Sequence, residues 1–306
     1  DEVERTGFIF LHGLTDSLWV RKLGATLEDY KALGERIERA TGLPICFEGL
    51  CKWVAFLYSR QDPRRTVPHR YFQARGDGTW KARGIEVRRR DTPAFIKRVQ
   101  EELLNELAKT RTRSEVAGIL PQLMDIVAAA VDRLRSGQVP HHELLLTYRL
   151  SRNPEEFRMQ TLNAIVAKQL TDRGIKLHAG EQIQYIVTEN DSPVPEQRAC
   201  AWELTNDFTE YDVKFYTERL IRAAETILSP FGVNEAMLRD WMEKALPVPQ
   251  VQKRLETFRM REYLGPLFEF AYQVEVRQRE GNRVVNQPRI RQSGPYTCTV
   301  ATVGAS

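Results

Sequence analysis

The spacing of apolar residues before residue 91 predicts an antiparallel sheet. Two β-prone runs, "FIFL" and "DSLWV", flank "HGLT" within residues 8–20, which is a hairpin pattern with Gly at the turn. Residues 70–89 repeat this pattern around a Gly-Asp-Gly turn. Between the hairpins, the apolar residues of 26–42 recur at helical spacing and a Gly follows them. Residues 1–91 are therefore predicted to form a small sheet with a helix packed on it.

Beyond residue 91 the apolar residues follow the helical period. A strand pair is predicted within 175–187, and the rest of residues 92–246 is predicted to be mainly helical. Four helices are expected, beginning at Thr92, Ser114, Asn153 and Glu210, the last three ending at Gly137, Gly174 and Gly232.

The C-terminal part of the sequence has a different pattern again. Residues 246–251, "LPVPQV", have the composition of a linker. Large apolar residues then recur at every second position over Phe268–Val276, which predicts a strand with one buried face. Further strands are expected at 284–291 and 296–303. The fold class predicted for the whole chain is thus α+β, with residues 247–306 forming a β-rich tail of unknown role.

Composition is that of a globular protein. Of the 306 residues, 42% are hydrophobic and 28% are charged. We find no run of about 18 apolar residues, so a membrane span is not expected. The first residues, "DEVERTG", lack the apolar stretch of a secretory signal. The four cysteines form no CxxC pair and no zinc-type cluster. These features favour a reduced, cytoplasmic protein without structural metal.

Positive charge is concentrated in one stretch. The net charge of the chain is only +4, but residues 60–98 contain twelve Lys or Arg against four Asp or Glu. Such a local excess is typical of a surface that binds a polyanion. It is equally compatible with a solvated, arginine-rich face that binds nothing. Charge alone leaves both interpretations open.

Several phrases of the sequence resemble family B DNA polymerases, in the order that the family has them. "HGLTDS" at 12–17 resembles the family's motif C, Tyr-Gly-Asp-Thr-Asp-Ser between two strands. "PHRY" at 68–71 and "RGIEVRRRD" at 83–91 resemble the family's Lys-Lys-Arg-Tyr motif and a following Arg-Gly-Leu-Glu…Arg-Arg-Asp strand. Thumb phrases follow, among them "LLTYRLSRNPEEF" and "YDVKFYTERLIRAAETILSPFG". The resemblance extends over residues 3–240.

The resemblance implies a division of the chain and a site. Residues 1–91 would be the C-terminal part of the polymerase palm, and residues 92–246 the thumb. Polymerases of this family hold two divalent ions with carboxylates from motifs A and C. By position, Asp16 matches the carboxylate of motif C that binds metal directly, while Leu14 replaces the other Asp and His12 replaces the Tyr. Motifs A and B and the exonuclease domain have no counterpart in this sequence.

The departures at the motif predict a catalytically degenerate site. Asp16 supplies one carboxylate, whereas two magnesium ions need several oxygen ligands in near-octahedral geometry. Asp16 is therefore a remnant catalytic residue and a weak metal candidate. Magnesium is expected only where another polypeptide completes the site, and no cofactor otherwise.

Arginines near the palm–thumb border are the predicted DNA contacts. Phosphate contacts from such residues position a duplex without distinguishing its sequence. The predicted DNA-binding residues are Arg70, Tyr71, Arg83, Arg88, Arg89 and Arg90.

Three functions remain open at this point. The first is a degenerate palm–thumb segment, inactive or incomplete by itself, that holds primer–template DNA. The second is a subunit or fragment of an active DNA-directed DNA polymerase, with motif A on another segment or with another group replacing the lost Asp. The third is a non-catalytic scaffold whose β-rich tail docks a protein. A cytoplasmic location is expected, at the nucleoid if the protein is prokaryotic, and no membrane partner is expected.

Overall fold

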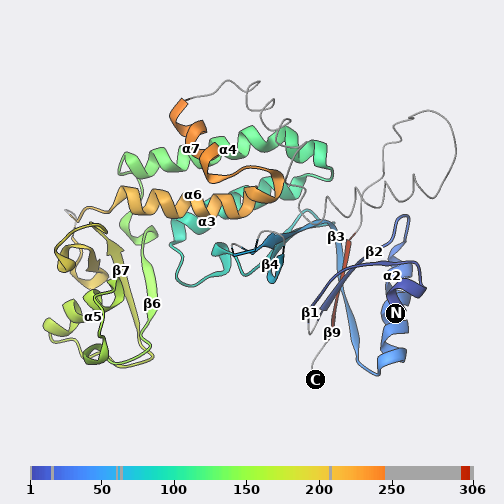
Figure 1. Ribbon diagram of the computed structural model, residues 1–306, viewed down its shortest axis with the longest axis horizontal. Helices are drawn as coiled ribbons and strands as arrows, with labels where there is room; N and C mark the ends of the chain where they lie inside the picture. The colour runs from blue at the N-terminus through green and yellow to red at the C-terminus, as the bar shows by residue number, and fades with distance from the viewer. Residues whose placement is uncertain are drawn as a thin grey trace.

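The computed structural model describes residues 2–14, 17–59, 61–62, 65–206, 209–244 and 298–303 (Figure 1). The helices are α1 (Glu2–Arg5), α2 (Leu27–Thr41), α3 (Ala94–Lys109), α4 (Arg113–Arg135), α5 (Leu162–Asp172), α6 (Val213–Leu228) and α7 (Glu235–Lys244). The strands are β1 (Ile9–Leu14), β2 (Ser17–Arg21), β3 (Ile45–Tyr58), β4 (Thr66–Arg75), β5 (Trp80–Arg83), β6 (Leu146–Arg149), β7 (Gln182–Val187), β8 (Ala199–Ala201) and β9 (Cys298–Val303). Short 3-10 helices are η1 (Glu86–Arg88), η2 (His141–Glu143), η3 (Pro154–Glu156), η4 (Pro195–Gln197), η5 (Trp202–Leu204) and η6 (Ser229–Phe231). This mixture confirms the predicted α+β class.

The larger sheet has six strands in the order β1-β2-β9-β3-β4-β5. Strand β9 is antiparallel to both of its neighbours, so β2 and β3 are parallel to each other and α2 connects them. Helix α2 begins at a capping box, in which Thr26 and Asp29 satisfy each other's backbone N–H groups, and a left-handed Gly42 follows its end. The unit is a split β-α-β motif whose middle strand comes from the C-terminal tail.

Alternate residues of β3 and β4 pack on opposite faces of this sheet, as the period of a strand requires. On one face Trp53 and Phe72 join a large apolar cluster with the helices. On the other face Phe56 and Tyr71 pack with Trp19 of β2. The indole N–H of Trp19 donates to Gln73 Oε1 at 3.2 Å. The two hairpins are therefore joined through a second, smaller aromatic cluster.

Helices α3, α4, α6 and α7 cover the first face, and their buried residues form one cluster with the strands. Phe72 is fully buried and its ring meets those of Trp53 and Phe231 at 5.9 and 6.2 Å. Because these contacts join residues on both sides of residue 91, the hydrophobic packing has no break at the predicted palm–thumb border.

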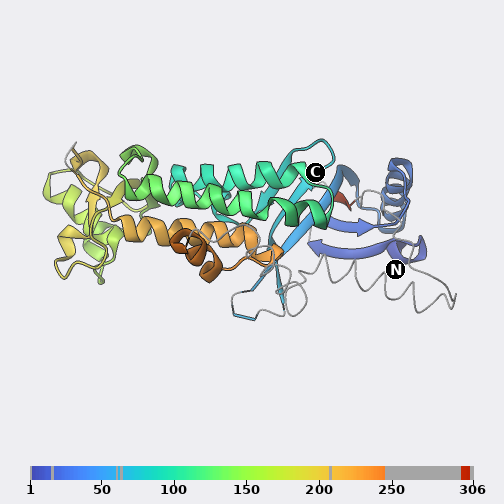
Figure 2. The same cartoon turned by 90° about the horizontal axis from the view of Figure 1, so that it is seen from above.

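A second unit lies at the far ends of the long helices. The sheet β6-β7-β8 and helix α5 pack there on α3, α4 and α6. The two sheets lie at opposite ends of the molecule, and the long helices connect them along one side (Figure 1). The described part of the structure therefore has the shape of an arch, with the helices at its top. Seen from above, α3, α4 and α6 run side by side along the long axis (Figure 2).

The third predicted helix is shorter than expected. The side chain of Asn153 does not cap it. Its Nδ2 donates to Glu156 Oε1, and its Oδ1 accepts from the backbone N–H of Ala179, so the side chain connects two parts of the loop region. A 3-10 turn forms at Pro154–Glu156, and α5 begins only after Thr161, whose hydroxyl accepts from the N–H of Ala164. The prediction of one helix from Asn153 to Gly174 was wrong because the capping pattern served a turn.

Two predicted strands also differ. The strand pair expected within 175–187 is a single strand, β7, whose partners β6 and β8 come from elsewhere in the chain. The second strand of the Gly-Asp-Gly hairpin ends at Arg83 and does not continue to Arg89. Gly84 has φ 69°, and an added Cβ would lie 2.1 Å from the carbonyl oxygen of His69. This left-handed residue ends the strand and turns the chain into η1.

Helix α4 is long and apolar enough, by length and composition, to cross a membrane. Leu120, Leu123, Val127 and Leu134 of this helix are fully buried against the other helices and strands. A core helix passes the same test, and the packing explains its composition.

In the tail, β9 confirms part of the strand expected at 296–303. The linker at 246–251 and the strands expected at Phe268–Val276 and 284–291 lie outside the described residues.

Phe72→Ala should destabilise the sheet and the helices together. Removing a fully buried ring that contacts both should cost about 3–5 kcal/mol. Urea unfolding followed by tryptophan fluorescence and by far-UV circular dichroism should show one shifted transition. Leu23→Ala, at a side chain that is 63% exposed, is the control. Separate transitions by the two probes would contradict a shared core.

Alkaline pH should loosen the small sheet through Tyr185. Burial raises the pKa of Tyr185 to about 12, above its ordinary value of 10. The folded state therefore keeps the phenol neutral where the unfolded state ionises it, so stability falls as the pH rises from about 10 to 12. Tyr185→Phe should remove about 1.4 kcal/mol of this pH dependence, measured by urea unfolding at pH 7 and pH 11. An equal loss of stability in both proteins at pH 11 would contradict it.

Candidate nucleic-acid interface and motif C hairpin

Strands β1 and β2 form the hairpin that carries the motif C-like sequence. Leu14 faces Ser17 across the ladder, and Thr15 and Asp16 between them lie outside the described residues. The side chain of Leu14 is half-buried and packs against the aromatic cluster of Trp19, Phe56 and Tyr71. At the position where the family has an acidic residue, this chain therefore has an apolar contact.

His12 holds the hairpin against β4. Its Nε2 lies 3.1 Å from the carbonyl oxygen of Pro68, which can only accept, so Nε2 carries the proton. The centre of the imidazole ring lies 4.4 Å from the centre of the Phe56 ring and 5.4 Å from that of the Trp19 ring. Burial lowers the pKa of His12, and the neighbouring His69 adds to the shift. At neutral pH His12 is a neutral packing residue of the hairpin.

Among the described residues, no group of three or more His, Cys, Asp or Glu side chains is placed to hold a metal. On the side away from β1, β2 pairs with β9. Thr302 of β9 stands opposite Ser17, and Ser17 directly follows Asp16 in the sequence. The residues of β9, Cys298–Val303, include no acidic residue.

The predicted DNA-binding arginines come from the second hairpin and the chain that follows it. Arg83 is the exposed last residue of β5. Arg70, on β4, is half-buried, and its Nε donates to the carbonyl oxygen of Gly84 at 3.2 Å. Arg70 therefore holds the turn at Gly84 in addition to presenting charge.

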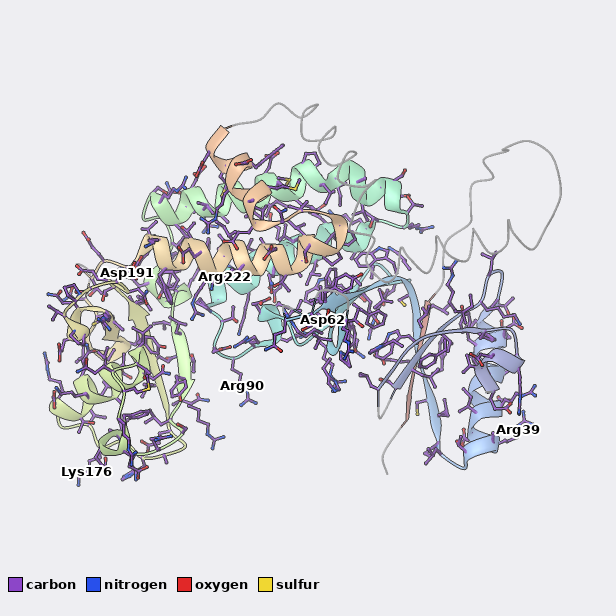
Figure 3. The ribbon with its side chains drawn as sticks, viewed as in Figure 1. Arg39, Asp62, Arg90, Lys176, Asp191 and Arg222 are labelled. Carbon is purple, nitrogen blue, oxygen red and sulfur yellow. The ribbon has the colours of Figure 1, made fainter. Side chains whose placement is uncertain are left out.

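Residues 86–90, here called the arginine segment, present three exposed cations where the sheet meets the helices. The guanidinium of Arg88 lies over the ring of Trp80, 5.4 Å from its centre. Arg89 is engaged in a two-pronged contact with Asp91, at 3.0 and 2.7 Å. These hydrogen bonds lower the pKa of Asp91 and raise the pKa of Arg89. Arg90 points away from the ribbon, towards the inner side of the arch (Figure 3).

Tyr71, also a predicted DNA contact, is placed differently from the other predicted contacts. Its side chain is 1% exposed, and its ring meets Trp19 edge-on at 5.0 Å. In this structure Tyr71 belongs to the aromatic core, so we leave it out of the proposed interface.

A buried polar network behind the arginine segment was missed by sequence reasoning. Gln100 of α3 is fully buried and makes hydrogen bonds to Glu86, to Val87 and to Ala223 of α6. The signal was present: Gln100 lies four residues after Ile96 and three before Leu103, within the apolar stripe of the helix. A glutamine at such a position must find buried partners.

The comparisons with known proteins bear on this geometry. The model of the family described as DNA polymerase family B matches residues 52–231. The chain belongs to this family. The match contains the arginine segment and the thumb-like helices, whereas the motif C hairpin lies before it.

Two relatives and one solved structure define the extent of the similarity. The DNA polymerase of Pyrococcus horikoshii is 27% identical over 252 residues, which are 78% of this chain and 19% of the relative. DNA polymerase 1 of Pyrococcus abyssi is 25% identical over 78% of this chain and 30% of its own length. The family B polymerase structure from Pyrobaculum calidifontis has a TM-score of 0.55 at 24% identity, over 76% of this chain and 28% of that one. This structural likeness concerns the fold, and the chain spans less than a third of each relative.

Proposed function

We propose that this chain is the palm–thumb portion of a family B polymerase-like protein and that it binds primer–template DNA through its arginine segment. The observation that carries the proposal is the exposure of Arg88 and Arg90 on a short segment anchored between the sheet and the thumb-like helices. Arg83 lies just before this segment and is exposed as well. Exposed arginines fixed to a rigid frame are suited to contact phosphates of a duplex.

We further propose that the chain is catalytically incomplete by itself. The support is chemical: Leu14 removes a carboxylate from the hairpin, and β9 brings none beside it. A site of two divalent ions would need carboxylates from another polypeptide. Such a polypeptide, carrying motifs A and B and an exonuclease domain, would make this chain one subunit or fragment of an active polymerase. Magnesium would bind only in that assembly.

DNA affinity should depend steeply on salt, and less so without Arg88 and Arg90. Each phosphate contact contributes about 0.9 to the slope of log affinity against log salt concentration. The double variant Arg88→Ala/Arg90→Ala should therefore bind a primer–template duplex more weakly, with a slope lower by about two. Fluorescence anisotropy with a labelled duplex, over a salt series, measures both quantities.

The matched control removes the same charge elsewhere. Arg39 of α2 and Arg135 of α4 are exposed and lie outside the arginine segment, Arg39 at the outer end of the larger sheet (Figure 3). Arg39→Ala/Arg135→Ala should keep the wild-type slope. Equal slopes in the two double variants would show that charge alone, without a defined surface, governs binding. No binding at low salt would favour the scaffold alternative.

Primer extension tests the proposed catalytic incompleteness. The chain alone, with magnesium or manganese, should not extend a primer. Leu14→Asp adds a second oxygen ligand beside Asp16, so it should bind Mn²⁺ more tightly than wild type in a calorimetric titration. Asp16→Asn in the Leu14→Asp background is the control and should lose that gain. Extension by the wild-type chain that disappears in Asp16→Ala would contradict the proposal and favour an active polymerase.

A further inference from the structure

Gln100 of α3 connects the arginine segment to α6. We propose that Gln100 is a positioning residue that orders the arginine segment before DNA binds. This inference rests on the proposed function, because it assigns a role in DNA binding to a residue that DNA cannot reach. The side chain of Gln100 is fully buried.

The amide of Gln100 is fully used in this role. Its Oε1 accepts from the backbone N–H of Val87 at 2.6 Å. Its Nε2 donates to the carbonyl oxygen of Ala223 on α6 at 2.7 Å and to the carboxylate of Glu86 at 3.0 Å. One side chain of α3 therefore joins the arginine segment to α6. The three hydrogen bonds go to three different residues. An apolar side chain at this position has no hydrogen-bonding atoms, so it would remove all three.

Thr226 of α6 completes the network from the other side. Its hydroxyl lies 3.3 Å from Glu86 Oε1 and 3.0 Å from the carbonyl oxygen of Arg222. The two carboxylate oxygens of Glu86 thus face two neutral hydroxyl or amide groups, one from each helix. Glu86 precedes Arg88, Arg89 and Arg90, so holding its carboxylate fixes the start of the segment that carries them.

The arginine segment has little order of its own. Its local backbone hydrogen bonds are those of one turn. The N–H of Arg88 donates to the carbonyl oxygen of Ile85, just before the segment, and the N–H of Arg89 to that of Glu86, each at 3.0 Å. A single 3-10 turn is weak by itself, and isolated short helices do not persist in water. Loss of the Gln100 amide would also leave the buried N–H of Val87 without its partner. The segment would then sample more conformations, and DNA would have to order it on binding.

Hydrogen exchange on the full chain tests the ordering without any DNA. Gln100→Met keeps an unbranched side chain of similar size and removes the hydrogen bonds. Exchange of the amides at 87–89 should be faster by roughly tenfold, the equivalent of one lost hydrogen bond. Unchanged protection at 87–89 in Gln100→Met would overturn the proposal.

The chain offers a matched pair of controls on one helix. Thr226→Val and Thr217→Val make the same chemical change at two buried positions of α6. The hydroxyl of Thr226 contacts Glu86, whereas that of Thr217 has no hydrogen-bond partner in the described part of the chain. Thr226→Val should raise exchange at 87–89 and Thr217→Val should not. An equal rise in both would mean general loosening and would overturn the proposal.

DNA binding by the same variants shows what the ordering contributes. At low salt, Gln100→Met should weaken affinity by roughly three- to tenfold, because binding then has to order the segment. The salt slope should stay at the wild-type value, since the arginines still reach the phosphates once bound. Arg88→Ala/Arg90→Ala should lower the slope instead, which separates positioning from contact.

The outcomes keep the two proposals apart. If the wild-type chain binds DNA and Gln100→Met binds with an affinity within twofold of the wild-type value, the role of Gln100 is overturned. The proposed function then still stands. A slope lowered in Gln100→Met as in the arginine variant would also overturn positioning. No binding by wild type would overturn the proposed function, and with it the DNA role of Gln100, whatever hydrogen exchange shows.

Discussion

The apolar contact between the larger sheet and the long helices is the constraint on which the rest of this structure depends. Phe72 and Trp53 from the sheet and Phe231 from the end of the α6 region share one cluster. Because protein interiors are close-packed, such a cluster fixes the relative orientation of its elements. The junction between sheet and helices is therefore set by packing, and it is at this junction that the arginine segment emerges.

The arginine segment and the motif C hairpin depend on this junction in different ways. The arginine segment is bound directly to the helices through the buried amide of Gln100, so its cations have a fixed base. The hairpin is itself part of the sheet, and its Trp19 and His12 pack with Phe56 on the face opposite the helices. Leu14 of the hairpin packs against the same aromatic cluster. The arginine segment is thus held by the helices, and the hairpin by the aromatic cluster.

Local signals in the sequence were sufficient where a pattern has one physical meaning. The helical stripe that includes Leu103 and Leu107 predicted α3, and the Gly-Asp-Gly turn predicted the β4–β5 hairpin. Asn153 shows the limit. The same capping pattern can begin a helix or close a turn, and a distant partner, the N–H of Ala179, decided for the turn. Tyr71 shows the same limit for a site, because the face of a strand that becomes buried is decided by what packs on it.

The sequence by itself determined the class of the fold, the helices α2, α3, α4 and α6, the two hairpins before residue 91, the family, and the run of arginines near the predicted palm–thumb border. These depend on local periodicity and on motifs in order along the chain. Only the tertiary structure decided that Tyr71 is buried and that β9 lies between β2 and β3. It alone brought Gln100 to the arginine segment. The physical reason is that burial and sheet order arise from contacts between residues far apart in the chain, which no local pattern encodes.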